Sequence, residues 1–113
     1  TREMLGAAEF AAMGASSVLI NVARGGVVNE PDLIEALSTR TIRGATLDVV
    51  SEEPLSESSP LWELDNCIIT PHDAGYSPLG DTRLGALFLE NLRRYIAGGT
   101  LINEISTTGF GDR

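Results

Sequence analysis

The 113-residue sequence predicts an α/β fold, specifically half of a doubly wound parallel sheet with flanking helices. Three short apolar runs of strand length alternate with segments of helical periodicity, an order typical of parallel strands joined by right-handed crossovers. The runs lack polar alternation, which predicts strands covered on both faces. Because three strands form only half of such a sheet, we expect further chain upstream or an association that protects the exposed edge.

The chain begins with a predicted helix and a predicted strand. Apolar residues recur at helical spacing over residues 3–13, and Gly14 ends this run. Residues 17–22 then form a short apolar run of the strand type. Gly25 and Gly26 follow closely and mark a turn.

A second helix is predicted to begin after Asn29 and to end near Thr39. Asn29 is a favourable N-cap, and Pro31 lies in the first turn, where its missing N–H costs nothing. The second strand is predicted over residues 44–50. The following loop, residues 51–60, is rich in proline, glutamate and serine, so we expect it to be polar and exposed.

The second half of the chain ends with a short helical turn, a strand and a long helix. Residues 60–64 predict one helical turn in which Leu61 and Trp62 pack inward. Residues 67–70 have the composition of a third buried strand. A long amphipathic stripe over residues 84–96 then predicts the last helix.

The charge balance of the sequence is strongly acidic. There are 16 acidic residues and 8 basic ones, and all the basic residues are arginine, which leaves a net charge of -8. An acidic surface without lysine is the pattern expected of a halophilic protein, in which high salt screens the self-repulsion. The same negative field disfavours nucleic acid and anionic membrane surfaces as partners.

The chain has one cysteine, Cys67, inside an apolar run. A single cysteine cannot form an internal disulfide, so we interpret it as a buried small hydrophobic residue of a cytoplasmic protein. No apolar run has the length of a membrane span. The chain also starts at Thr1 and opens directly into a helical pattern, which we interpret as the sign of a fragment.

Charged side chains follow each of the three predicted strands. Arg24 follows the first strand, Asp48 and Glu53 follow the second, and His72, the only histidine, follows the third. The carboxyl ends of parallel strands lie along one edge of a sheet, where open α/β sheets bind their ligands. The sequence therefore predicts that these side chains converge, although each alone is more often a salt bridge or a cap.

The residue types indicate acid–base chemistry on a carboxylic acid. The Arg24 guanidinium offers a planar fork of donors that suits a carboxylate. His72 can pass a proton to or from a substrate oxygen near neutral pH. Glu53 is the candidate that stabilises the imidazolium, and Asp73, the neighbour of His72, is a rival partner.

Three segments resemble the D-isomer-specific 2-hydroxyacid dehydrogenase family. They are residues 19–26 (LINVARGG), residues 47–55 (LDVVSEEPL) and residues 59–72, which begin with SPLW and end with TPH. The similarity runs in order from about Thr1 to Ile105. It implies a Rossmann-like unit in which residues 1–106 are the C-terminal half of a dinucleotide-binding domain. Residues 107–113 are small and polar, so we expect them to form a flexible tail.

The resemblance implies the roles of the catalytic residues. Arg24 would bind the substrate carboxylate, Glu53 would orient the histidine, and His72 would be the general acid/base. The implied reaction is hydride transfer between NAD or NADP and a small 2-hydroxy acid or 2-oxo acid. No metal site is implied. The implied cofactor-binding residues are Ala23, Arg24, Asp48, His72 and Gly75.

The chain also departs from the pattern of the family. Val50 stands where an aromatic residue is common, and Asp73 stands where a small or apolar residue is usual. No G-x-G-x-x-G segment is present, so the phosphate-binding turn is missing. We therefore expect a fragment that is inactive alone, that depends on a missing N-terminal part of the same protein, and that is a homodimer when complete.

Two alternatives remain beside the dehydrogenase. One is a noncatalytic, corepressor-like module that binds a partner on the same fold. The other is a relative that acts on formate or phosphite, with the same hydride chemistry. The joint presence of Arg24, Glu53 and His72 favours an enzyme, because a binding module needs no such set.

Overall fold

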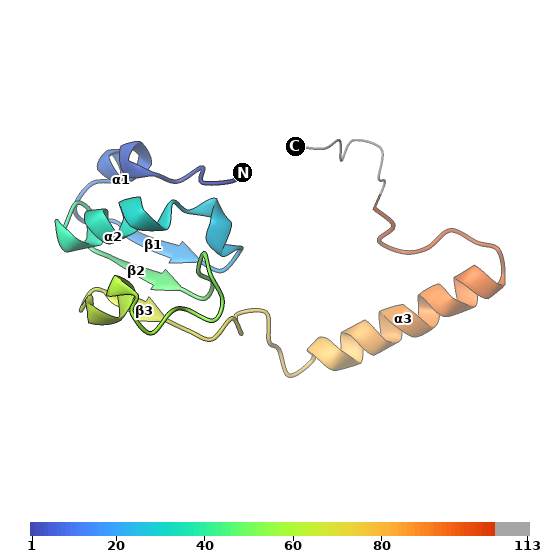
Figure 1. The fold of residues 1–113 in the computed structure, drawn as a ribbon. Coiled ribbons are helices and arrows are strands. Elements are labelled where there is room, and N and C mark those ends of the chain that lie inside the picture. The colour runs from blue at the N-terminus through green and yellow to red at the C-terminus, as the bar shows by residue number, and fades with distance from the viewer. Residues whose placement is uncertain (106–113) are drawn as a thin grey trace. The chain divides into compact units, whose positions relative to one another are not determined.

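The computed structural model describes residues 1–105, which divide into a first unit, Thr1–Gly75, and a second unit that begins at Tyr76 (Figure 1). Their elements are α1 (Ala7–Met13), β1 (Val18–Asn21), the short 3₁₀ helix η1 (Gly25–Val27), α2 (Glu30–Ser38), β2 (Gly44–Leu47), the 3₁₀ helix η2 (Pro60–Glu63), β3 (Cys67–Ile69) and α3 (Gly80–Ile96).

The first unit is built on a three-stranded sheet in the order β1-β2-β3, and both strand pairs are parallel. In the register, Asn21 at the end of β1 lies opposite Leu47, and Leu47 lies opposite Ile69 near the end of β3. All three strands therefore end at one edge. This arrangement confirms the predicted α/β class with a parallel sheet and flanking helices.

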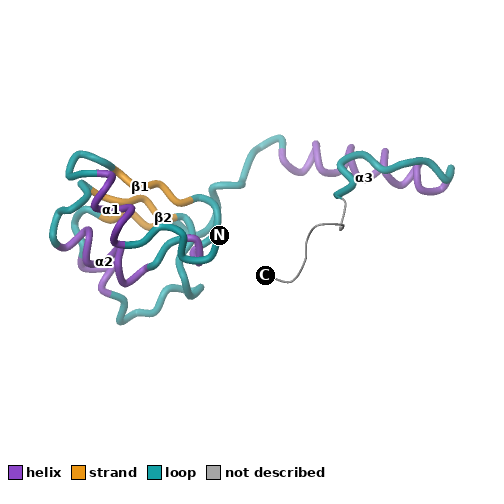
Figure 2. The backbone as a smooth tube through the Cα atoms, turned by 90° about the horizontal axis from the view of Figure 1, so that it is seen from above, coloured by secondary structure: helices purple, strands orange, loops and turns teal. Residues whose placement is uncertain are grey.

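The core lies on one face of this sheet. Figures 1 and 2 show α1 and α2 on the same side of the strands. Phe10 of α1, Leu33 and Leu37 of α2, and Leu61 of η2 are almost fully buried, and they join Leu19 and Leu47 from the strands in one cluster. Burial of this apolar surface is the main term that favours the fold.

The prediction that both faces of the strands are covered is wrong within the first unit. The burial of β1 alternates, and Val18, Ile20 and Ile68 are exposed on the face opposite the core. The physical reason is that α1, α2 and η2 all contribute to the single cluster on the other face. A continuous apolar run does not reveal how many faces neighbouring elements cover.

The first helix is shorter than predicted, because its expected first turn is extended. The N–H of Leu5 donates to the carbonyl of Val27 at 3.2 Å, and the carbonyl of Leu5 accepts from the N–H of Asn29 at 2.9 Å. Leu5 thus pairs with the segment around Val28 as an isolated parallel bridge. Long-range pairing outweighs the local helical periodicity here, and α1 begins at Ala7.

The second helix begins as predicted. The Asn29 side chain accepts a hydrogen bond from the N–H of Asp32 at 3.1 Å, Pro31 lies in the first turn, and Thr39 is the C-cap.

The second and third strands end earlier than predicted, at Leu47 and Ile69. Cys67 is half-buried, and burial is the main cause that raises the pKa of its thiol.

Only one of the two residues predicted to pack inward from η2 does so. Leu61 is 1% exposed, whereas Trp62 is 53% exposed. Successive residues of a 3₁₀ helix point about 120° apart, so a single turn buries one of them. The indole Nε1 of Trp62 donates to the carbonyl of Ser56 at 3.0 Å.

The second unit contains α3, which begins at Gly80, before the predicted start at residue 84. The helix ends near Gly98, whose positive φ of 67° terminates the last turn. The predicted apolar stripe is present in sequence, but no residue of α3 is buried.

Among residues 1–105, no helix is long and apolar enough to cross a membrane. The predicted tail, residues 107–113, lies outside the described residues.

Candidate active site

The turn that carries Arg24 is held by a buried asparagine at the end of β1. Asn21 is 6% exposed. Its Oδ1 accepts from the N–H of Ala23 at 3.1 Å, and its Nδ2 donates to the carbonyl of Arg24 at 3.1 Å. Both hydrogen bonds fix the backbone just beyond the strand, so the Arg24 side chain starts from a defined position at the sheet edge.

Gly25 brings this turn against the segment that leads to Glu53. A Cβ atom at Gly25 would collide with the backbone carbonyl of Val50, so only glycine allows the two backbones to approach so closely. The Arg24 guanidinium is exposed and donates to the carbonyl of Ala23 at 2.7 Å. Among residues 1–105, no hydrogen bond or ion pair joins Arg24 to Glu53 or His72, although its charge acts on Glu53.

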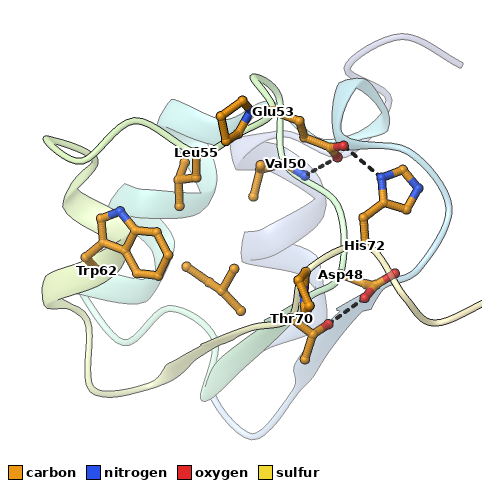
Figure 3. A pocket seen from close by; sticks show the side chains of 10 residues that line it. Asp48, Val50, Glu53, Leu55, Trp62, Thr70 and His72 are labelled. Atoms are coloured by element: carbon orange, nitrogen blue, oxygen red, sulfur yellow. Dashed lines mark hydrogen bonds and ion pairs between the residues drawn. The ribbon is translucent and has the colours of Figure 1, made fainter.

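Glu53 and His72 form a direct pair across the edge. The Nδ1 atom of His72 lies 2.7 Å from Oε2 of Glu53, and Oε1 of Glu53 accepts from the N–H of Val50 at 3.3 Å (Figure 3). The two side chains are 47% and 40% exposed. The structure therefore joins two residues that are distant in sequence, and it pairs His72 with Glu53 rather than with the rival Asp73.

The surroundings of Glu53 favour its ionised form. The hydrogen bond with His72 is the main cause that lowers the pKa of Glu53 below its ordinary value of 4.5, and the N–H of Val50 acts in the same direction. Burial opposes this shift, while the charges of His72 and Arg24 add to it. Glu53 is thus a carboxylate at neutral pH and can accept a hydrogen bond from a protonated Nδ1 of His72.

Asp48 holds the turn on which His72 stands. Asp48 is 4% exposed, and its carboxylate accepts three hydrogen bonds: from the Thr70 hydroxyl at 2.6 Å, from the N–H of Asp73 at 3.0 Å and from the N–H of Ala74 at 2.9 Å. The Thr70 hydrogen bond is the main cause that lowers the pKa of Asp48. Burial opposes it, and the two N–H groups and the His72 charge support it.

A cavity of about 420 Å³ lies beside the pair (Figure 3). The apolar lining of this cavity includes Val50, Leu55 and Trp62. Its polar end is formed by Glu53 and His72. In Figure 3 the second ring nitrogen of His72, Nε2, points away from Glu53. Since Glu53 occupies Nδ1, Nε2 is the ring atom available for proton transfer to a bound molecule.

The remaining predicted residues also lie at this edge. Ala23 directly precedes Arg24 and Gly75 directly follows the Asp48-bound turn, and both are exposed. No heavy atom lies within 4 Å of a Cβ built on Gly75. Among residues 1–105, no group of three or more histidine, cysteine, aspartate or glutamate side chains is suited to a metal ion.

Sequence reasoning missed the roles of Asn21 and Thr70. Both are polar residues at the end of an apolar run, and both hydrogen-bond at a strand end to hold a functional turn. A polar residue that closes a buried strand has few reasons to be there other than to satisfy nearby backbone or a charged side chain. The position of Asn21 and Thr70 at the ends of apolar runs was therefore the feature of the sequence that could have predicted these roles.

The Glu53–His72 pair predicts a pH effect with a definite sign. Because the folded-state pKa of Glu53 lies below 4.5, the pair contributes stability that is complete above about pH 4.5 and is lost as pH falls through the folded value. In ¹³C NMR titrations of the Glu53 carboxyl, His72→Leu should raise its pKa toward 4.5. Asp73→Asn is the matched control and should leave it unchanged. An identical Glu53 titration in wild type and His72→Leu contradicts the pairing.

The chain is similar in sequence to two dehydrogenases over most of its length. The chain is 36% identical over 110 residues to D-3-phosphoglycerate dehydrogenase of Escherichia coli, covering 94% of this chain and 27% of that protein. It is 40% identical over 100 residues to glycerate dehydrogenase of Methylorubrum extorquens, covering 87% of this chain and 32% of that protein. The chain thus spans less than a third of the length of these two relatives.

A solved structure and a family model agree with these relatives. The D-isomer specific 2-hydroxyacid dehydrogenase from Xanthobacter autotrophicus, in complex with NADPH and MES, matches with a TM-score of 0.84 and 40% identity, over 94% of this chain and 43% of that one. The family model "D-isomer specific 2-hydroxyacid dehydrogenase, NAD binding domain" matches residues 1–74. This chain therefore belongs to the D-isomer specific 2-hydroxyacid dehydrogenase family, within its NAD-binding domain.

Proposed function

We propose that this chain carries the catalytic side chains of an NAD(P)-dependent oxidoreductase that interconverts small 2-hydroxy acids and 2-oxo acids. The observation that carries the proposal is the 2.7 Å contact between Nδ1 of His72 and Oε2 of Glu53 at the sheet edge next to the Arg24 turn. The names of the relatives, a phosphoglycerate and a glycerate dehydrogenase, support 2-hydroxy acids over formate or phosphite as the substrate class.

His72 is the general acid/base in this proposal. With Nδ1 held by Glu53, the ring presents Nε2 to the substrate oxygen, donates a proton when the oxo acid is reduced and accepts one when the hydroxy acid is oxidised. The negative charge of the Glu53 carboxylate stabilises the imidazolium form of His72. It also fixes the orientation of the ring, as an acid–base catalyst requires.

Arg24 binds the carboxylate of the substrate. Its guanidinium has one donor directed to the carbonyl of Ala23, and its remaining N–H groups are available for a paired contact with a carboxylate. The Gly25 contact keeps the Arg24 turn beside the Val50–Glu53 segment, so the acid end and the reacting oxygen of one small molecule lie within reach of the same edge.

The residues at this edge fit the nicotinamide end of NAD(P). Ala23 and Gly75 are small and exposed and leave room for a flat ring. The Asp48 carboxylate uses three of its roughly four acceptor positions, so one position is left for an amide donor. Arg24 and His72 complete the proposed cofactor-binding set. When bound, NAD(P) would supply the hydride chemistry.

The complete enzyme needs more than this chain. The sequence has no G-x-G-x-x-G segment for the pyrophosphate, and the chain spans less than a third of the relatives above. We therefore propose that an N-terminal part of the same protein supplies the phosphate-binding turn and the rest of the substrate site. On this view the chain is inactive alone and acts within a complete homodimer.

We propose separately, from the acidic composition, that the protein works at high salt concentration. With a net charge of -8 and no lysine, the folded state repels itself at low salt. Salt that screens this repulsion should stabilise a protein adapted to a saline cytoplasm.

His72→Ala in the complete protein should lower kcat by a factor of about 10² to 10⁴, because the substrate oxygen loses its proton donor. The dissociation constant for NAD(P) should stay within about twofold, since the imidazole contributes little to binding the cofactor as a whole. Steady-state kinetics and fluorescence titration of the cofactor measure the two quantities. Turnover close to wild type would remove His72 from this role.

Arg24→Gln in the same protein should raise the KM for the acid substrate by about 10- to 100-fold, because the carboxylate loses a charge-assisted, paired contact. Arg40→Gln is the matched control. Arg40 forms an exposed ion pair with Asp65 at 2.7 Å, away from the strand ends that carry the site, so its loss should leave KM unchanged. Equal effects of the two substitutions contradict a specific role for Arg24.

The midpoint of thermal unfolding should rise between low salt and about 1 M KCl, where the Debye length falls to about 3 Å. A titration with sucrose is the control, because it strengthens burial without screening charge. A midpoint that is flat or falls with KCl counts against a halophilic origin.

A further inference from the structure

The turn that carries His72 is anchored on both sides of the histidine by one buried carboxylate. Asp48, directly after β2, accepts from the Thr70 hydroxyl before His72 and from the backbone N–H groups of Asp73 and Ala74 after it. All three donors come from a stretch of five residues, and Asp48 itself is only 4% exposed. The residues on both sides of His72 are thus hydrogen-bonded to the same side chain.

This anchoring matters because the backbone of His72 is in an unfavourable conformation. Its φ angle is +59°, in the left-handed region that a residue with a side chain seldom adopts. Such a conformation persists only where surrounding contacts enforce it. Among residues 1–105, the side chain of His72 forms one hydrogen bond, to the Glu53 carboxylate, and the Glu53 side chain is 40% exposed. The buried contacts that enforce the backbone conformation are those to Asp48.

Thr70 holds one oxygen of the Asp48 carboxylate. Its hydroxyl makes the shortest of the three hydrogen bonds, 2.6 Å to Oδ1, and the donor is attached to the end of β3, a fixed element of the sheet. With Oδ1 held there, Oδ2 faces the N–H of Ala74 at 2.9 Å. The same hydroxyl is the main cause that keeps the pKa of Asp48 low, which keeps the acceptor ionised.

We propose that Thr70 is a positioning residue, whose hydroxyl orients Asp48 so that Asp48 fixes the turn and places His72 against Glu53. The role extends the reaction proposed above and rests on it, because it assigns to Thr70 an effect on turnover that is exerted through His72. Thr70 itself touches neither the substrate nor the cofactor in this account.

The experiment compares three variants of the complete protein. Thr70→Val removes the hydroxyl at nearly constant shape, Thr70→Ser restores it, and Thr46→Val makes the same chemical change at a half-buried position of β2. The Thr46 hydroxyl has no hydrogen bond among residues 1–105 and lies outside the proposed site. The two readouts are steady-state kinetics and the hydrogen-exchange rates of the Asp73 and Ala74 amides.

Thr70→Val should lower kcat by about tenfold, while the KM for the acid changes by less than about twofold. Exchange of the Asp73 and Ala74 amides should accelerate by about tenfold, because their acceptor is no longer held in place. Thr70→Ser should restore both quantities to near wild type. Thr46→Val should change neither.

Wild-type kcat in Thr70→Val, or a folded Thr70→Ser that fails to restore kcat, overturns the proposal. If Thr70→Val does not fold, as judged by circular dichroism, Thr70→Ala repeats the test without the branched side chain. Failure of both to fold makes Thr70 a structural residue and also overturns the proposal. If the wild-type protein turns over no 2-oxo or 2-hydroxy acid, the proposed function fails, while amide exchange still reports separately whether Thr70 holds the turn.

Discussion

The parallel register of β1, β2 and β3 is the constraint on which the rest of the structure depends. Because all three strands run in one direction and end together, the residues that follow them are brought to a common edge whatever their distance in sequence. Glu53 and His72 are 19 positions apart in the sequence, and the parallel register brings them to a contact of 2.7 Å. An antiparallel sheet of the same strands would send successive loops to opposite ends and separate the pair.

Buried polar side chains at the strand ends convert this coarse convergence into a defined geometry. Asn21 holds the turn after β1, and Asp48 holds the turn after β3. Each satisfies backbone groups that would otherwise be left without partners next to an apolar core, which is costly. Folding and positioning therefore use the same hydrogen bonds, and the exposed residues Arg24 and His72 need only extend from turns that are already rigid.

Much of this could be predicted from sequence, because strand composition and the order of elements carry the topology. The convergence of Arg24, Glu53 and His72 follows from their positions after apolar runs. What could not be predicted depends on long-range partners. Leu5 leaves a helical pattern to pair with Val28, and His72 adopts a positive φ on a turn held by Asp48. No local sequence pattern predicts which way the Asp48 side chain points, since its three hydrogen-bond donors lie more than twenty residues away.

The absence of a side chain at Gly25 has a mechanical consequence. The backbone of the arginine turn rests directly on the backbone carbonyl of Val50, with no flexible side chain between them to absorb a displacement. The Arg24 turn and the Val50–Glu53 segment therefore cannot move closer to each other. Under the function proposed above, an inward motion of the Arg24 turn toward Val50 would have to displace the Val50–Glu53 segment with it.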